Sequence, residues 1–253
     1  MKTDYNAMQR YLFILVAALM LGACSTAPVK KGDEVIEPSF SPERILDPSA
    51  VYLSDTISDP FQGFNRTMYR FNYHFDRYVF LPAVTGYQWI TPDVMQAGIH
   101  NFFRNVDDIR TLMNSILQLD GTKTMNTFTR LFINTTTGLL GFFNVADDIP
   151  RINEDFGQTL GHWGVGNGPF LVLPILGPSN LRDTAGLGVD WYVNTALRDE
   201  LDMETWQELT WTGLYALDLR ANTAFRYFET GSPMEYELVR LLYTTARRME
   251  IER

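Results

Sequence analysis

Residues 91–121 have the sequence TPDVMQAGIHNFFRNVDDIRTLMNSILQLDG and predict one long amphipathic helix. Thr91-Pro92-Asp93 is typical of a helix start, and Gly121 is expected to end the helix. Apolar side chains recur at helical spacing and form one continuous stripe: Ile99, Phe102, Phe103, Val106, Ile109, Leu112, Met113, Ile116 and Leu117. The opposite face carries Arg104, Asp107, Asp108 and Asn114. This pattern indicates a mainly α fold.

A second helical pattern begins at Asp59. This residue type suits an N-cap, Pro60 then occupies the first helical position, and Gln62 follows at N3. Large apolar side chains recur every three or four residues after it: Phe64, Met68, Phe71, Phe75 and Tyr78. We therefore expect a helix from residue 60 to about 79.

Two more helical stretches and one helix start lie further along the chain. Residues 125–132 predict a helix that ends where the backbone loosens at 135–138. Residues 206–228 place an apolar set on one helical face: Trp206, Leu209, Gly213, Leu217, Ala221, Ala224 and Phe228. Ser232-Pro233-Met234-Glu235 has the pattern of a capping box and predicts the start of a last helix.

Each amphipathic stripe is open to two interpretations. Such stripes usually pack against a protein core, and the alternative is that some of them face acyl chains. The longest apolar stretches after the N-terminal region, 138–146 and 168–177, are shorter than the 18 or more residues of a spanning helix. The helices could still lie within one leaflet if they close on one another, which leaves no unpaired backbone facing lipid.

Residues 161–174, GHWGVGNGPFLVLP, form a glycine- and proline-rich segment. Five of the first nine residues are glycine or proline, so a helix is not expected there. A phosphate-binding loop would need a Lys-Ser/Thr pair after the glycines or Rossmann spacing, and neither is present. Two interpretations stay open: a turn that leads into a short buried hairpin, or an irregular segment that lines or gates a cavity.

The N-terminal region predicts secretion and lipid attachment. Lys2 and Arg10 precede an apolar run that ends in Leu21-Gly22-Ala23-Cys24, which is typical of a signal peptide at residues 1–23 and a lipobox. Cys24 is the only cysteine of the chain and is expected to carry diacylglycerol through a thioether. Translation starting at Met8 would give the same mature protein.

The residues after Cys24 bear on location and on domain organisation. Ser25 follows in place of the Asp that retains lipoproteins at the inner membrane, so the outer membrane is favoured. Residues 24–58 are rich in Pro, Ser, Asp and Glu and predict a flexible tether. Residues 59–253 are expected to form a single helical domain.

Charge and residue types exclude several functions. Thirty acidic against 21 basic residues give a net charge of −9, which would repel nucleic acid. The three histidines are far apart and form no metal-binding motif: His74, His100 and His162. Ser179 lacks the second glycine of a nucleophile elbow, and the acidic pairs at 147–148 and 154–155 suit loop ends and helix starts. Neither enzymatic activity nor a cofactor or metal is expected.

Several motifs resemble the MlaA/VacJ lipoproteins, in the family's order, from about residue 59 to 190. The first is DPFQGFNRTMYRFN at 59–72. The others are NFFRN at 101–105, RLFINTTTG at 130–138, FGQTLGHWGVG at 156–166, LPILGPS at 173–179 and LRD at 181–183.

The resemblance implies a fold, a function and partners. The fold would be a ring-shaped bundle of amphipathic helices in the periplasmic leaflet of the outer membrane, with an amphipathic channel. The function would be non-enzymatic transport of phospholipid between the outer membrane and a soluble periplasmic carrier protein, which maintains lipid asymmetry. Trimeric outer-membrane porins would be partners. The rivals are a lipid-hydrolysing enzyme and a structural porin-associated lipoprotein without transport activity.

Motif membership also suggests site residues. Four asparagines are expected to line or brace the ring: Asn65, Asn72, Asn101 and Asn105. Any one of them taken singly is better explained as a helix cap or a hydrogen-bond anchor in the core. The glycine- and proline-rich segment would shape the channel through Gly164, Gly166, Pro169 and Pro174.

Overall fold

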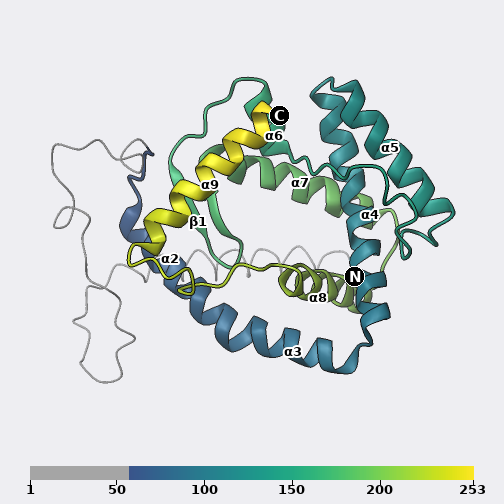
Figure 1. Cartoon of the computed structure of the whole chain (residues 1–253), viewed down its shortest axis with the longest axis horizontal. Coiled ribbons are helices and arrows are strands. Elements are labelled where there is room, and N and C mark those ends of the chain that lie inside the picture. Colours follow the sequence, from purple (N-terminus) through teal and green to yellow (C-terminus); the bar gives the residue numbers. More distant parts are fainter. Residues whose placement is uncertain (1–56) are drawn as a thin grey trace, which may run out of the picture. The chain divides into compact units, whose positions relative to one another are not determined.

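Helices make up most of residues 57–253, which are the residues that the computed structural model describes (Figure 1). The helix predicted from residue 91 is α4 (Asp93–Leu117), and the next is α5 (Gly121–Thr136). The mainly α prediction is therefore confirmed. The signal peptide, Cys24 and nearly all of the predicted tether lie outside the described residues.

The first predicted helix is longer than expected. α2 (Gln62–Phe75) continues through a π-helical turn, η4 (Asp76–Phe80), into α3 (Leu81–Ile90). The predicted end near residue 79 is wrong because Pro82 lies in the first turn of α3, where its missing N–H costs no hydrogen bond. A π turn accommodates an extra residue within one helical path.

Asp59 does not cap the first helix. Phe61 occupies the N-cap position and makes no side-chain capping bond. The Asp59 carboxylate instead accepts hydrogen bonds from the Asn65 amide (2.7 Å), the Tyr236 hydroxyl and Arg240 Nη1 (3.1 Å). The N-cap prediction is wrong because a distant helix supplies stronger, charged donors for this carboxylate.

Gly121 begins a helix and does not end one. Asp120 is the N-cap of α5, and its Oδ1 accepts from the backbone N–H groups of Thr122 (3.0 Å) and Lys123 (2.9 Å). α4 has already ended at Leu117. Asp120, just before Gly121, therefore determines where α5 begins, because its carboxylate satisfies N–H groups that the helix start leaves free.

The two C-terminal helices also differ from their predictions. α8 (Thr205–Ala221) ends before Ala224 and Phe228, so the predicted face is too long. α9 (Glu235–Glu252) starts without a side-chain cap, because Glu235 accepts from Phe228 N, the Thr230 hydroxyl and the Tyr69 hydroxyl. The capping-box prediction at 232–235 is therefore wrong.

The glycine- and proline-rich segment contains a hairpin. β1 (Phe170–Leu173) pairs antiparallel with β2 (Gly177–Asn180), with Phe170 opposite Asn180. The hairpin interpretation is confirmed. The helix α6 (Phe156–His162) nevertheless includes Gly161, so helix was wrongly excluded at the start of this segment.

Two side-chain caps position the helices that flank the hairpin. Asp155 caps α6 by accepting from Gln158 N at 2.8 Å. Asn180 caps α7 (Leu181–Asp199) by accepting from Asp183 N at 2.8 Å. Each cap satisfies a backbone N–H group that a helix start leaves without a partner.

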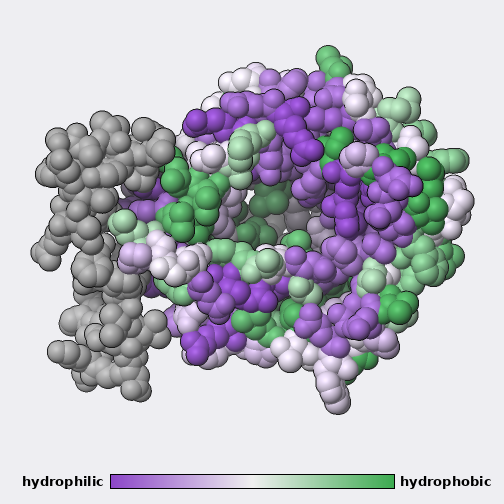
Figure 2. Space-filling model, viewed as in Figure 1, coloured by the Kyte–Doolittle hydropathy of each residue, from purple (hydrophilic) through white to green (hydrophobic). Residues whose placement is uncertain are grey.

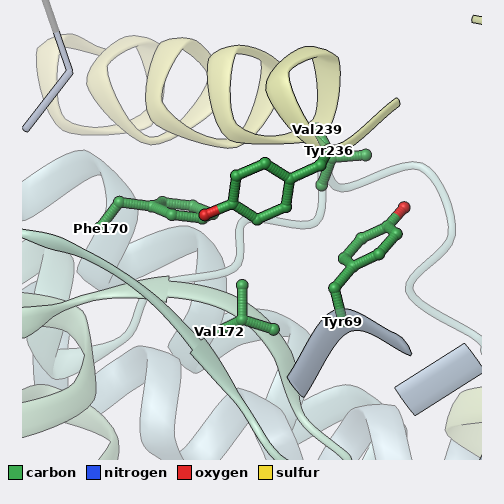
Figure 3. Packing of buried hydrophobic residues seen from close by; sticks show 5 residues of the cluster. All are labelled: Tyr69, Phe170, Val172, Tyr236 and Val239. Carbon is green, nitrogen blue, oxygen red and sulfur yellow. The ribbon is translucent and has the colours of Figure 1, made fainter. Parts of the chain in front are cut away.

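A small apolar core lies where α2, the hairpin and α9 meet. Figure 3 shows its members between the hairpin and α9: Tyr69, Phe170, Val172, Tyr236 and Val239. The rings of Tyr69 and Tyr236 pack edge to face, with centroids 6.0 Å apart. Such aromatic contacts add to the stabilisation that comes from area burial alone.

The contacts between elements form a closed circuit. α3 packs on α8, α8 on α4, α4 on α6, and α6 on α9. α9 then contacts β2, and β2 contacts α2, which continues through η4 into α3. Figure 2 shows a hollow near the middle of this face, with apolar residues in its depth and hydrophilic residues on much of its rim. The arrangement agrees with the expected ring-shaped bundle.

Candidate functional site

The interior of the described part is unusually polar. Its buried residues include 25 polar or charged ones and nine hydrophobic ones. Folded domains in water normally bury apolar side chains and leave polar ones at the surface. This inverted distribution is the main feature to explain.

The helix α4 shows the inversion along its length. Asp108, Thr111 and Asn114, on or next to its polar face, are buried. Ile109 and Ile116, on its apolar stripe, are exposed. Part of the stripe, at Ile109, Ile116 and Leu117, therefore faces outward, whereas Phe103 near its beginning is buried and its other members are half-buried. This outcome favours the alternative in which stripes face acyl chains.

Large apolar side chains are exposed in groups. Trp89 is 86% exposed, and Ile90 and Val94 next to it are also exposed, at the corner between α3 and α4. A second group follows the end of α4, the length of α5 and the loop after α5: Ile116, Leu119, Phe128, Phe132, Leu139, Leu140 and Phe143. Groups of this kind mark surfaces that meet an apolar partner or a lipid phase.

The lengths of the helices limit how this surface could meet a membrane. Among residues 57–253, no helix combines the length and the hydropathy needed to cross a bilayer. An apolar surface on short helices can still be covered by the acyl chains of a single leaflet.

A hydrogen-bonded network fills the space between α4 and α6. Asn114 is fully buried, and its Oδ1 accepts from the Thr159 hydroxyl at 2.8 Å. The Gln118 amide donates to Glu154 at 2.9 Å, and Lys123 forms an ion pair with Glu154 at 2.9 Å. Because their partners are present, these groups avoid most of the cost of burying polar atoms.

A buried ion-pair network joins α6, α7 and α9. Arg247 contacts Asp183 and Asp155, each at 2.8 Å, and Arg182 contacts Asp183 at 2.7 Å. Burial alone would raise the pKa of Asp183, but the hydrogen bonds from Arg247, Tyr243 and Arg182 hold it below its usual range. Asp183 therefore stays ionised as the centre of the network.

Asn65 and Asn72 fasten the hairpin to α2. The Asn65 amide donates to Phe170 O at 3.0 Å, and its Oδ1 accepts from Val172 N at 2.9 Å. Asn72 repeats the arrangement two turns later, with Leu173 O at 2.9 Å and Ile175 N at 2.7 Å. Each side chain thus satisfies one N–H and one C=O of the hairpin that the pairing of its two strands leaves free.

Asn101 and Asn105 hold a different segment, the loop after α5. Asn101 donates to Phe142 O at 3.3 Å, and Asn105 donates to Leu140 O at 3.3 Å. Gly141 in this loop has φ +91°, and a Cβ there would lie 2.4 Å from Asn105 Cβ. Only glycine fits at that position.

The four predicted glycines and prolines lie in and around the loop before the hairpin. Gly164 has φ +87° and open space around it, and Gly166 is also unobstructed. The Pro169 carbonyl accepts from Leu181 N at 3.0 Å, and the Pro174 carbonyl accepts from Leu176 N at 2.8 Å in the hairpin turn. The asparagines therefore hold two separate segments, the hairpin and the loop after α5, and of these four residues only Pro174 lies within one of them, in the hairpin turn.

The sequence did not predict the buried charges. Arg130 and Asp108 are buried, and Arg130 donates to Ala146 O (2.9 Å) and Ile149 O (2.6 Å). Arg130, Arg182 and Asp183 all lie within the family-like motifs, which was the available signal, but no local pattern indicates their partners.

His100 and Ser179 each contact a neighbouring side chain. His100 pairs with Asp218 at 3.0 Å, and the Ser179 hydroxyl is bonded to the Thr184 hydroxyl at 2.9 Å. Within residues 57–253, no cluster of three or more His, Cys, Asp or Glu side chains could hold a metal ion.

These features define a helical protein with a largely polar interior, groups of large apolar side chains on its exterior and a hollow in the face that its helices surround. The family model described as MlaA lipoprotein matches residues 57–250. The chain therefore belongs to the MlaA lipoprotein family, as the sequence motifs predict.

Individual relatives agree with this assignment. The chain is 41% identical over 135 residues to the "Intermembrane phospholipid transport system lipoprotein MlaA" of Escherichia coli K12, which covers 51% of this chain and 54% of the relative. The Shigella flexneri protein of the same name is 39% identical over 155 residues, covering 59% and 60%. An uncharacterized Rickettsia felis protein is 43% identical over 129 residues, covering 50% and 51%. The chain spans about half the length of the curated relatives it matches.

A solved structure has the same fold. It is described as "Structural basis for maintenance of bacterial outer membrane lipid asymmetry" and is 30% identical in sequence. The TM-score is 0.61, and the match covers 77% of this chain and 99% of the other.

Proposed function

We propose that the chain is a non-enzymatic component of intermembrane phospholipid transport. As an outer-membrane lipoprotein, it provides a channel for phospholipid between the outer membrane and a periplasmic carrier, and so maintains lipid asymmetry. The observation that carries the proposal is the inverted distribution of residues: most buried side chains are polar, and large apolar side chains are exposed in groups on α3, α4 and α5. Figure 2 shows a hollow in the same molecule. The names of the relatives support the proposal.

The physical problem is the cost of moving the two ends of a lipid. A diacyl phospholipid has roughly 30 methylenes, so its release into water costs on the order of 20 kcal/mol. Its charged headgroup is costly to move through hydrocarbon. A passage with polar groups lowers the second cost while the tails stay against apolar surface.

The proposed location is the periplasmic leaflet of the outer membrane. Acylation at Cys24 would anchor the chain. The exposed apolar groups on α3, α4 and α5 would then be covered by acyl chains of one leaflet. The proposed partners are a trimeric outer-membrane porin and a soluble lipid-carrier protein.

The predicted site residues have bracing roles in this proposal. Asn65 and Asn72 hold the hairpin, and Asn101 and Asn105 hold the loop after α5. Gly164, Gly166, Pro169 and Pro174 shape the segment between α6 and the hairpin turn. The proposal requires these segments to keep their positions beside the passage.

Reconstitution tests the function directly. The lipidated full chain is placed in vesicles that contain labelled phospholipid, and a lipid-accepting periplasmic protein is added. We expect transfer to the acceptor above the level of vesicles without the protein, and less transfer with the unanchored Cys24→Ala variant. Transfer equal to that of empty vesicles, with the protein folded and inserted, would overturn the proposal.

The rivals give different results in the same preparation. A structural lipoprotein would bind porin without accelerating transfer, and its deletion would leave surface phospholipid unchanged. A lipid-hydrolysing enzyme would release fatty acid or lysolipid from the labelled substrate.

A further inference from the structure

A slot between α4 and α8 is lined almost entirely by carbon atoms, and its volume is about 280 Å³. α4 contributes Ile99, Phe102 and Phe103, and α8 contributes Trp206 and Trp211. The rings of Phe102 and Phe103 pack edge to face on Trp211, with centroids 5.4 Å away in each case. None of the described residues that line the slot is charged. The slot therefore suits an apolar occupant.

Three polar groups at the slot are already satisfied by α8 and its N-cap, Glu204. Gln207 Oε1 accepts from Glu204 N at 2.8 Å, and the Thr210 hydroxyl donates to Trp206 O at 2.7 Å. The Trp206 indole N–H donates to the Glu204 carboxylate at 2.9 Å. A polypeptide segment in the slot would bury N–H and C=O groups among these satisfied neighbours, which is costly. A hydrocarbon chain carries no such groups.

The slot is continuous with apolar surface that is exposed. Met95 lies one turn before Ile99 on α4 and is exposed. Trp206 in the wall of the slot is 61% exposed, and Leu209, three residues further along α8, is 69% exposed. Because the slot opens on this surface, an acyl chain could enter it from a lipid phase without crossing water.

The size of the slot limits how much of a lipid it holds. Its volume is just below the roughly 300–1,000 Å³ of typical small-molecule sites. A diacyl phospholipid has roughly 30 methylenes, so the slot holds a part of one chain and not the whole molecule. Met203, whose flexible thioether also lines the slot, can adapt to a mobile chain.

The charge next to the slot is negative. The Glu204 carboxylate is bonded to the indole of Trp206 in the wall. Residues 198–208 contain five acidic residues and one basic residue: Arg198, Asp199, Glu200, Asp202, Glu204 and Glu208. Carboxylates at the end of a slot repel a headgroup with net negative charge, and this repulsion weakens with salt.

We propose that the α4–α8 slot binds one acyl chain of a phospholipid whose headgroup has no net charge. The chain lies against the aromatic wall, and the headgroup stays outside the slot, near Glu204. This inference rests on the proposed function, because it takes phospholipid as the molecule transported.

Photocrosslinking tests the slot on the full chain in non-ionic detergent. The probe is phosphatidylethanolamine with a diazirine near the end of one tail. The crosslink yield against probe concentration gives the affinity, and peptide mass spectrometry locates the crosslinks. We expect crosslinks on residues 99–103 and 203–214 that saturate at one probe per protein. These positions test the slot in the wild-type protein, without any substitution.

Two tryptophan substitutions on α8 test whether the slot itself binds the chain. Thr210→Trp places a large ring over the slot and should weaken binding about tenfold, which is the loss of roughly two buried methylenes. Thr212→Trp makes the same change at an exposed position on the opposite face of α8 and should leave binding unchanged. Circular dichroism confirms that both variants are folded.

A second probe tests the headgroup. Phosphatidylglycerol with the same tail should bind about threefold more weakly than phosphatidylethanolamine at low salt, which is the size of an interaction between exposed charges. The difference should vanish in about 1 M salt and in the double variant Glu200→Gln/Glu208→Gln. Glu252→Gln, at an exposed carboxylate of α9, is the matched control and should preserve the difference.

Four outcomes would overturn the site. Crosslinks confined to other helices, or equal effects of Thr210→Trp and Thr212→Trp, would show that the slot does not bind the chain. Tighter binding of phosphatidylglycerol would contradict the headgroup preference. Displacement of the probe by a peptide of residues 40–56, and not by unlabelled phosphatidylethanolamine, would assign the slot to the chain's own N-terminal segment.

The two proposals can fail separately. If reconstituted protein transfers lipid but Thr210→Trp binds the probe normally, this site is wrong and transport stands. If binding behaves as expected but no transfer occurs, the site stands and the transport function is wrong.

Discussion

Two regions of the molecule are stabilised by opposite kinds of interior. Between α2, the hairpin and α9, apolar and aromatic side chains are buried, as in a protein that folds in water. Between α4, α5 and α6, most buried side chains are carboxylates, amides, hydroxyls and guanidinium groups, while several large apolar side chains, such as Ile116 and Phe128, are exposed. The second region suits surroundings that are themselves apolar, because water then does not compete for its internal hydrogen bonds.

The largest effect is expected from the polar region. Asp108→Ala leaves Arg130 and Arg151 without their carboxylate, and breaking a buried ion pair on one side costs about 3–5 kcal/mol. Urea unfolding in detergent measures the loss, with Asp148→Ala at an exposed position as the control. Equal stability of the two variants would mean that the ion pairs of this region do not stabilise it.

A smaller effect is expected at a polar anchor beside the apolar core, where Asn72 of α2 holds the hairpin. Asn72→Leu removes the bonds to Leu173 O and Ile175 N and should cost about 1–3 kcal/mol. The same variant should disturb outer-membrane lipid asymmetry, which surface exposure of phospholipid in cells reports. Normal asymmetry at an unchanged protein level would remove Asn72 from the residues that serve the passage.

The apolar core should respond to the loss of methyl groups. Val172 is fully buried, and Val172→Ala should destabilise the protein by roughly 1.5–2 kcal/mol through lost burial and a small cavity. Thermal unfolding in detergent measures the change. Val94→Ala, at an exposed position of α4, is the control, and an equal effect at both positions would contradict the comparison.

The smallest change in stability is expected at the exposed apolar surface. Phe128→Ser should change the free energy of unfolding by less than about 0.5 kcal/mol in detergent, because the Phe128 side chain is 52% exposed. It should nevertheless weaken vesicle binding of unacylated protein, which flotation measures. The substitution Thr136→Ser, at an exposed polar position of the same helix, is the control. Unchanged binding would mean that this surface does not meet lipid.

Much of the fold followed from local patterns. The apolar stripe at residues 99–117 predicted the helix α4. The glycines and prolines at 161–174 predicted a break in helical structure, and a hairpin was one of two interpretations of that segment. Helix ends were predicted less well. Asp59 and Glu235 look like caps in the sequence, but each carboxylate accepts from a side chain far away in the chain, the hydroxyls of Tyr236 and Tyr69 respectively.

The site could be predicted only in part. The motifs singled out Asn65, Asn72, Asn101 and Asn105, and their hydrogen bonds to two loops explain why an amide is needed at each position. They did not indicate which loop each asparagine holds. The pairing of Arg247 with Asp155 and Asp183 was also out of reach, because these residues are separated by more than 60 positions.

The sequence by itself determined that the chain is mainly helical, that its helices are amphipathic and that it resembles the MlaA/VacJ lipoproteins. Only the tertiary structure decided which face of each helix points inward. Periodicity shows that a helix has two unlike faces, but a stripe has the same spacing whether it packs on a core or faces lipid. The contacts of Asp108 with Arg151 and of Asn114 with Thr159 show that the polar face of α4 points inward.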